Sequence, residues 1–201
     1  MNKLPGILEE VVNQLSSLPG LGPKSSLKIG LTLLKWPKDK VLGLAHSIIE
    51  LKESLFLCDI CGCITDVNPC RICNDPLRDE SLLCIVPDLD SLLTVEESGL
   101  FRGKFLVLGG LLSPLEGVQI YDLEIDRLKN RLKDGSVKEV ILALGTTKES
   151  EITESYITDM IKKQFPQIIV SRLAQGIPLG MMLKYVDTET LKQSFNYRQK
   201  L

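Results

Sequence analysis

Five cysteines fall within sixteen residues of the sequence, in the stretch CDICGCITDVNPCRIC that begins at residue 58. A Cys-x-x-Cys pair can bring two sulfurs to one metal ion, and two such pairs supply the four ligands of a tetrahedral zinc site. The two pairs here are Cys58, Cys61, Cys70 and Cys73. We therefore predict one structural zinc ion per chain, bound by these four thiolates and helping to fold a segment too short for its own core.

The two remaining cysteines have other roles. Cys63 could bind only in a Cys-x-Cys arrangement with Cys61, which would break the symmetry of the paired turns, so we interpret it as spare. Cys84 lies in the apolar run SLLCIV and is expected to be a buried core residue. A redox role for the pairs is less favoured because two pairs side by side are unusual for a redox motif. A catalytic zinc is disfavoured because four thiolates leave no position for water.

Composition suits a globular protein of the cytoplasm. The chain has 201 residues, of which 44% are hydrophobic and 25% charged, and no apolar run approaches the roughly 20 residues of a membrane span. The N-terminal stretch carries acidic residues, unlike a signal peptide, and clustered cysteines in a reducing compartment favour metal binding. The net charge of −2 argues against a uniformly basic surface, but residues 1–57 hold seven lysines against five acidic residues.

A glycine-containing turn connects two predicted helices ahead of the cysteines. Apolar residues recur at helical spacing over residues 7–18, and a second helical pattern starts at Pro23, directly after LPGLG. Such a helix-hairpin-helix pattern lets the backbone approach a phosphate and points first-turn N–H groups toward it. We predict that DNA is contacted by Gly20, Gly22, Lys24 and Lys28. A tight turn between two packed helices is the alternative reading, and a third helix is expected after Pro37.

Short apolar runs alternate with helical patterns after the cysteines. The predicted strands are residues 81–86, 104–110, 139–144 and 167–173. The predicted helices are residues 89–98, 123–133 and 150–164, with a last helix from residue 188 to the C-terminus in which Leu191 and Phe195 could pack. This alternation indicates an α/β fold with a mostly parallel sheet covered on both faces. The natural divisions of the chain are residues 1–57, 58–80 and 81–201.

The order of these parts resembles the RecR family of bacterial recombination mediators. The resemblance covers essentially the whole chain and rests on several motifs in the family's order. They are LPGLGPKS, the Cys-x-x-Cys-Gly turn, PCRICNDPLRD, LSPLEG, EVILA and GIPLG. In this family the α/β part is a toprim domain, the fold shared with topoisomerases and primases.

The resemblance implies a DNA clamp and not an enzyme. Members form ring-like homo-oligomers, here expected to be dimers or tetramers, that hold single- and double-stranded DNA. They act with RecO and RecF to help place RecA on single strands coated by SSB. The zinc ligands and the hairpin residues of the family fall on the positions named above, with Lys28 the least secure of them.

The carboxylates of a catalytic toprim enzyme are missing from their expected places. Such enzymes put a glutamate at the end of the first strand and Asp-x-Asp after a later one, to hold Mg²⁺. Here Pro87 stands at the glutamate position, and GTT at 145–147 follows the later strand. The acidic pair in DLD (88–90) is expected to open a helix, which leaves Glu149 and Glu151 as weak metal candidates. The alternative functions are a Mg-dependent toprim-type nucleic-acid enzyme and a protein-only adaptor.

Overall fold

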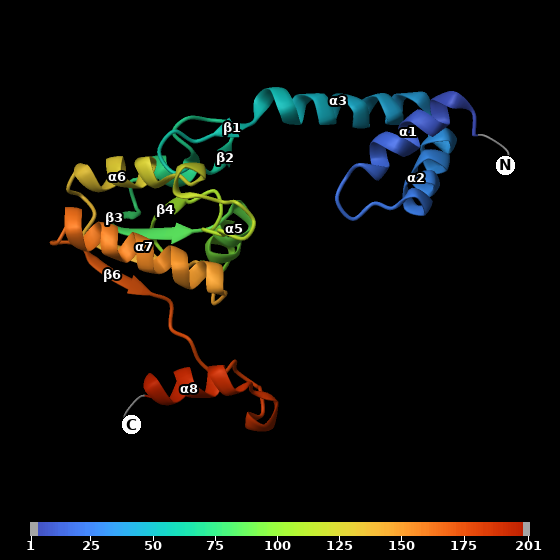
Figure 1. The fold of residues 1–201 in the computed structure, drawn as a ribbon. Helices are drawn as coiled ribbons and strands as arrows, with labels where there is room; N and C mark the ends of the chain where they lie inside the picture. Colours follow the sequence, from blue (N-terminus) through green and yellow to red (C-terminus); the bar gives the residue numbers. More distant parts are fainter. Residues whose placement is uncertain (1–3, 199–201) are drawn as a thin grey trace. The chain divides into compact units, whose positions relative to one another are not determined.

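The computed structural model describes residues 4–198, which divide into two compact units (Figure 1). The first unit ends at Leu55 and is helical, and the second begins at Phe56 and contains all the strands. The predicted fold class is confirmed: N-terminal helices, a four-cysteine group, a parallel sheet with helices and a C-terminal helix. Among the described residues, no helix combines the length and the apolar character needed to cross a membrane.

The helical unit consists of α1 (Gly6–Ser16), α2 (Pro23–Lys35) and α3 (Lys38–Ser54). Proline stands at the first position of α2, as the sequence predicts. The first two helices approach closely at Gly30, where an added Cβ would lie 3.0 Å from the side chain of Leu8 and 3.7 Å from that of Val12. Gly30 and Val12 are buried there, so the absence of a side chain at Gly30 sets how near α1 and α2 can come.

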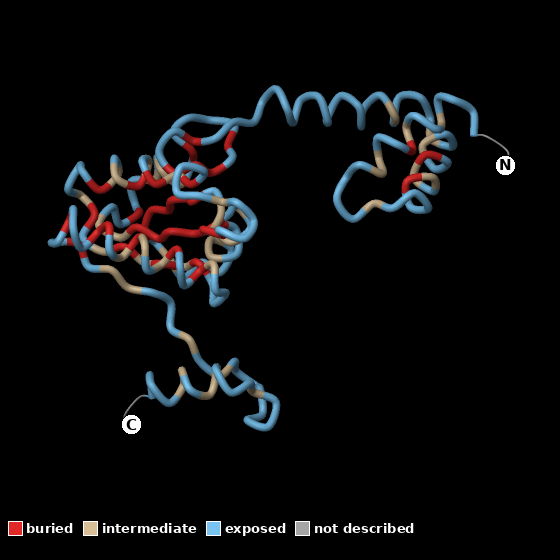
Figure 2. Tube along the Cα trace, viewed as in Figure 1, coloured by how far each residue is buried: buried red, intermediate tan, exposed pale blue. Residues whose placement is uncertain are grey.

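The apolar residues of α3 do not form a core. No residue of this helix is buried within the described chain, and Ile48 and Leu51 are 61% and 62% exposed. Figure 2 shows α3 exposed along nearly its whole length. Helical spacing correctly predicted this helix. It could not predict whether another surface covers the apolar side of α3, which stays exposed since α1 and α2 pack on each other.

Four parallel strands make the sheet of the second unit, in the order β4-β3-β5-β6. They are β3 (Asp79–Val86), β4 (Gly103–Val107), β5 (Glu139–Leu142) and β6 (Ile169–Arg172). The predicted helices appear as α5 (Leu89–Glu97), α6 (Ile125–Lys133) and α7 (Lys148–Gln164). The predicted strand over 104–110 is shorter than expected because Gly109 and Gly110 turn the chain at φ values of 86° and 152°.

The two faces of the sheet carry different layers, because successive side chains of a strand point to opposite faces. Leu83 and Ile85 belong to the larger core, which also contains buried residues of α6 and α7. Cys84 and Val86 belong to the other core, with Phe105, Leu92 of α5 and the clustered cysteines. Cys84 is therefore a buried core residue, as predicted, and the cysteines pack on the same face of the sheet as α5.

The cysteine segment (residues 58–75) contains little regular structure. It includes β2 (Ile64–Thr65), which pairs with β1 (Phe56–Leu57) in an antiparallel ladder, and the single turn α4 (Arg71–Asn74). Two short 3₁₀ turns, Ile120–Asp122 and Leu183–Tyr185, lie further along the chain.

The predicted last helix is α8 (Thr188–Asn196), and the end of that prediction, residues 199–201, lies outside the described residues. Leu191 is half-buried, but Phe195 is 69% exposed and does not pack as expected. No side chain of this nine-residue helix is more than half-buried, so α8 has no core of its own within the described chain.

Candidate functional site

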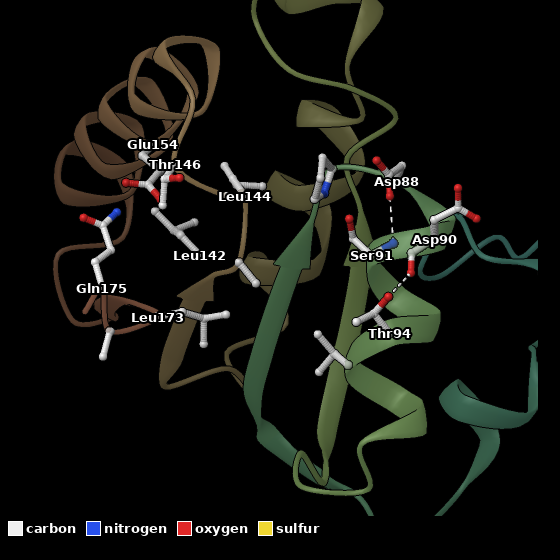
Figure 3. Close-up of a pocket in the computed structure, with 15 residues that line it drawn as sticks. Asp88, Asp90, Ser91, Thr94, Leu142, Leu144, Thr146, Glu154, Leu173 and Gln175 are labelled. Carbon is white, nitrogen blue, oxygen red and sulfur yellow. Dashed lines mark hydrogen bonds between the residues drawn. The ribbon is translucent and has the colours of Figure 1, made fainter. Parts of the chain in front are cut away.

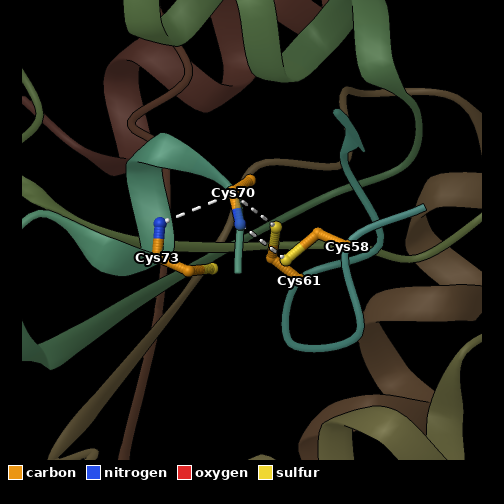
Figure 4. Close-up of side chains that lie close together, drawn as sticks. All are labelled: Cys58, Cys61, Cys70 and Cys73. Carbon is orange, nitrogen blue, oxygen red and sulfur yellow. Dashed lines mark hydrogen bonds between the residues drawn. The ribbon is translucent and has the colours of Figure 1, made fainter. Parts of the chain in front are cut away.

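The four cysteines predicted to bind metal come together in the structure (Figure 4). Their Sγ atoms all lie within 4.8 Å of one another, and those of Cys61 and Cys70 are 3.5 Å apart. Zinc–sulfur bonds of about 2.3 Å in a tetrahedron place the sulfurs about 3.8 Å apart. Three of the cysteines are buried and Cys73 is half-buried. The donor set and its spacing therefore fit one metal ion with a closed coordination shell.

A tight turn presents the first cysteine pair. The Cys58 amide donates to the Cys63 carbonyl at 2.8 Å, and the Gly62 amide donates to the Cys58 carbonyl at 2.9 Å. Gly62 closes this turn with a φ of 74°, and an added Cβ would lie 3.3 Å from a backbone oxygen of β4. The Val107 amide of β4 in turn donates to the Cys61 carbonyl at 2.8 Å, which ties the turn to the sheet.

Backbone amides also point at the sulfurs. The Cys73 amide lies 3.4 Å from the Cys70 sulfur, and the Cys70 amide lies 3.4 Å from the Cys58 sulfur. The Cys63 amide lies 3.5 Å from the Cys61 sulfur. N–H groups aimed at sulfur favour its charged form, which is the form that binds metal.

The thiols perturb one another strongly. The pKa of Cys61 is lowered to about 5, chiefly because the Cys73 thiol hydrogen-bonds to its sulfur. That same interaction, together with burial, raises the pKa of Cys73 far above its usual range. Burial and the charge on Cys61 raise the pKa of Cys70 to about 12. Four sulfurs this close cannot all ionise alone, so a bound cation is what would allow the full set of thiolates.

Cys63 does not join the group, in agreement with its interpretation as spare. It is buried, and its Sγ donates to the Ile64 carbonyl at 3.2 Å. Burial also raises its pKa to about 11, so it stays a neutral thiol. Cys63 serves the site through its backbone amide, which any residue except proline would provide.

Two cations that the sequence did not point out hold the cysteine segment on the sheet. Lys104 of β4 donates to three carbonyls of the segment, and Arg127 of α6 donates to two more. These partners are 29 to 69 residues away in the chain, so no local pattern connects them. The one sequence feature that could have pointed to these contacts is a lysine in the otherwise apolar run KFLVLGG.

The hairpin between α1 and α2 leaves the start of α2 without a side-chain cap. Gly20 adopts a φ of 79°, and Gly22 is the N-cap of α2 with no side-chain cap. Pro23 has no N–H, and the Ser26 amide donates to the Gly22 carbonyl at 3.0 Å. The amide of Lys24 and the one after it thus lie in the first turn, where a helix has no internal partner for its donors. An anion would be accepted there.

All the charges on α2 are positive. The helix contains Lys24, Lys28 and Lys35 and no acidic residue. At 100° per residue these three lysines fall within about 40° of one another around the helix, and they span about 16 Å along it. All three are exposed. The face defined by Lys24, Lys28 and Lys35, called the lysine face below, could therefore follow a nucleic-acid backbone.

The edge of the sheet where toprim enzymes hold metal carries a cavity of about 480 Å³ (Figure 3). Pro87 is buried at the end of β3. Asp88 is the N-cap of α5 and accepts from the Ser91 amide at 2.8 Å, and Asp90 lies in the first turn, so this acidic pair opens a helix as predicted. Figure 3 places Glu154 on the opposite side of the cavity from both aspartates.

The remaining acidic residues at this edge do not gather around one point. Glu149 lies in the first turn of α7, where backbone N–H groups and the Thr147 hydroxyl keep its pKa low. Burial raises the pKa of Glu154, and Arg172 opposes that effect. In the part of the chain that the structure describes, the four cysteines are the one group of three or more side chains placed to hold a metal.

Comparison with known proteins assigns each part of the chain. Residues 8–52 match the family model "RecR, helix-hairpin-helix", residues 81–174 match "Toprim domain", and residues 176–199 match "RecR, C-terminal". The recombination protein RecR of Maridesulfovibrio salexigens is 56% identical over 201 residues, which is all of both chains. This chain belongs to the RecR family. The RecR proteins of Nitratidesulfovibrio vulgaris and Moorella thermoacetica are 53% and 39% identical, over 100% and 98% of each chain.

Proposed function

We propose that this protein is a DNA-binding mediator of recombinational DNA repair in the cytoplasm. In this proposal it forms a ring-like homo-oligomer, a dimer or tetramer, that holds single- and double-stranded DNA. With RecO and RecF it helps to load RecA onto single strands coated by SSB. The observation that carries the proposal is the lysine face next to a phosphate-accepting turn, in a chain of the RecR family whose relatives are named recombination proteins.

DNA binding is assigned to the hairpin and α2. Gly20 and Gly22 would let the backbone approach a phosphate, and Lys24 and Lys28 would neutralise it, with Lys35 extending the contact along the helix. The overall charge of −2 opposes binding of a polyanion, so a local concentration of charge is needed. A ring would bring the lysine faces of several chains to one duplex and multiply a weak contact.

The exposed apolar side of α3 supports the oligomer. The helix has no buried residue, although it carries several large apolar side chains. Contiguous exposed apolar surface of this kind is typical of a protein-protein interface. A second copy of the chain is the occupant that a ring requires.

Zinc is the metal proposed for the four-cysteine group. Four thiolates in a closed tetrahedral shell are the ligands of structural zinc sites and leave no position for a substrate. The ion would stabilise the cysteine segment (residues 58–75). We retain residues 1–57, 58–80 and 81–201 as functional divisions, with the middle one packed against the sheet.

A non-catalytic role is proposed for the toprim domain. Pro87 has no side-chain atom that could bind a metal ion, and Gly145 and Thr146 follow β5 after only Ala143 and Leu144. Asp88 is engaged in capping α5. A phosphoryl-transfer site needs carboxylates that converge on one Mg²⁺ ion, and the scattered acids at this edge support binding without cleavage.

The test is a gel-shift experiment with the full-length chain on linear and circular DNA, with and without Mg²⁺. Wild-type protein should shift both DNAs and leave them intact, and the shift should weaken as salt increases. Lys24→Glu should abolish the shift, while Lys163→Glu makes the same charge change at an exposed lysine of α7 and should still shift DNA. Zinc content and oligomeric mass should be unchanged in both variants.

Three results would count against the proposal. If Lys24→Glu shifted DNA as strongly as wild type, the hairpin would not be part of the DNA-binding site. Mg²⁺-dependent nicking or relaxation would make the protein a toprim-type enzyme. No shift for wild type, alone or with RecO, would favour a protein-only adaptor.

A further inference from the structure

A buried lysine hydrogen-bonds to the backbone at the second cysteine pair. Lys104 is only 4% exposed, and its Nζ donates to the carbonyls of Ile72, Cys73 and Asp75 at 3.2, 2.9 and 2.8 Å. An ammonium group has three N–H donors, so all of them are used on this one segment. Lys104 thereby fixes the backbone of Cys73 relative to β4.

An arginine holds the first cysteine pair in the same way. Arg127 of α6 donates through one nitrogen to the carbonyls of Cys58 and Asp59, at 2.7 and 2.6 Å. Its Nε donates to the Glu124 carboxylate at 3.0 Å, which orients the guanidinium. Each cysteine pair is thus bound through its backbone by one cation, and the two cations come from different elements of the sheet domain.

Charge explains why a lysine is tolerated at so buried a position. Burying an ammonium costs several kcal/mol unless an opposite charge compensates it. Lys104 takes part in no ion pair among residues 4–198, and its partners are neutral carbonyls. Four thiolates around a divalent ion carry a net charge of −2. Lys104 brings a positive charge to the segment that holds the second cysteine pair, whereas the charge of Arg127 is shared with the Glu124 carboxylate.

We propose that Lys104 and Arg127 are positioning residues of the metal centre. They hold the two cysteine pairs on the sheet, and their positive charge offsets part of the charge of −2 of a tetrathiolate site. The inference rests on the proposed zinc site and assigns its stability to residues outside the Cys-x-x-Cys pairs. Outer partners of metal ligands typically contribute roughly 10- to 100-fold in affinity.

The test compares zinc release from full-length wild type, Lys104→Met and Arg127→Met. Zinc per chain and the rate of release to a chromogenic chelator are measured under conditions where circular dichroism shows a folded protein. Both variants should release zinc roughly 10- to 100-fold faster than wild type. Arg127→Lys keeps the charge and should release zinc more slowly than Arg127→Met.

The matched control is Arg131→Met. Arg131 lies one turn further along α6, its side chain is 18% exposed against 22% for Arg127, and it pairs with Asp134 and not with the cysteine segment. This variant should release zinc at the wild-type rate. Lys104→Met could fail to fold because its site is buried, and the half-buried Arg127 then decides the outcome.

A spectrum separates charge compensation from simple support of the fold. In Co²⁺-loaded protein, loss of a positive charge near the thiolates should move the sulfur-to-cobalt charge-transfer band of Arg127→Met to longer wavelength. The d–d bands of tetrahedral Co²⁺ should persist. An unchanged charge-transfer band, or equal release rates for Arg127→Lys and Arg127→Met, would overturn the charge role. Wild-type release rates in folded Lys104→Met and Arg127→Met would overturn the inference, whereas a wild type that holds no zinc would overturn the metal site itself.

Discussion

Replacing Cys70 by serine should cost the protein both its metal and a large part of its stability. Cys70 is 3% exposed, lies 3.5 Å from the Cys61 sulfur and accepts the Cys73 amide. A serine hydroxyl remains protonated and does not replace a thiolate on zinc. Cys63→Ser is the matched control, since Cys63 is also buried in the same segment but its side chain donates only to the Ile64 carbonyl.

The expected magnitudes differ enough to be resolved. Structural zinc sites contribute about 10–16 kcal/mol of apparent binding free energy in small modules, and forfeiting only ~4 kcal/mol of that would matter in a domain stable by ~5–15 kcal/mol. At about 2–4 °C per kcal/mol, Cys70→Ser should lower the melting temperature by roughly 8–16 °C. Loss of one weak hydrogen bond, worth ~1 kcal/mol or less, should lower it by at most about 4 °C for Cys63→Ser.

Differential scanning calorimetry and zinc analysis of the same purified samples give the assay. Wild type and Cys63→Ser should hold one zinc ion per chain, and Cys70→Ser should hold clearly less. Chelator treatment of wild type should reproduce the melting temperature of Cys70→Ser. The reasoning would be refuted if Cys70→Ser melted with wild type, or if Cys63→Ser lost zinc to the same degree.

Three further predictions, one of them with a control variant, test other parts of the structure. Gly62→Ala should destabilise the protein by ~1–2 kcal/mol and weaken zinc retention in chelator titrations, because its φ is 74° and the new Cβ meets a backbone oxygen. Arg78→Met should lower the unfolding free energy in urea by about 3–5 kcal/mol, because it strands the partly buried Glu96. Arg71→Met, the control at an exposed ion pair, should leave the unfolding free energy unchanged. Lys35→Glu should reduce the slope of log affinity against log salt by about 0.9 per chain bound to duplex DNA, and an unchanged slope would exclude this residue from the contact.

Local patterns were sufficient to predict the main helices and strands and the group of four cysteines. The Cys-x-x-Cys spacing identified Cys58, Cys61, Cys70 and Cys73 as one group because each pair is formed within a single turn of chain. The strands and helices of the sheet domain followed from apolar periodicity, and Pro23 predicted the start of α2. The ends of helices and strands shifted by a few residues, as at β4, which ends before the positive φ of Gly109 and Gly110.

Burial was harder to anticipate than secondary structure. Phe195 of α8 was expected as a packing residue, yet it is exposed within the described chain, and α3 has no buried residue there. Periodicity reports that one side of a helix is apolar, but not which surface covers it. The covering surface depends on other elements, or on other chains.

The sequence by itself determined what could bind: four thiolates at metal spacing, and a glycine turn followed by lysines on one side of a helix. Only the tertiary structure decided what holds the four cysteines in place. Lys104 of β4 and Arg127 of α6 hydrogen-bond to the cysteine segment from 29 to 69 residues away in the chain. Such contacts form through space, and a one-dimensional pattern records only neighbours along the chain.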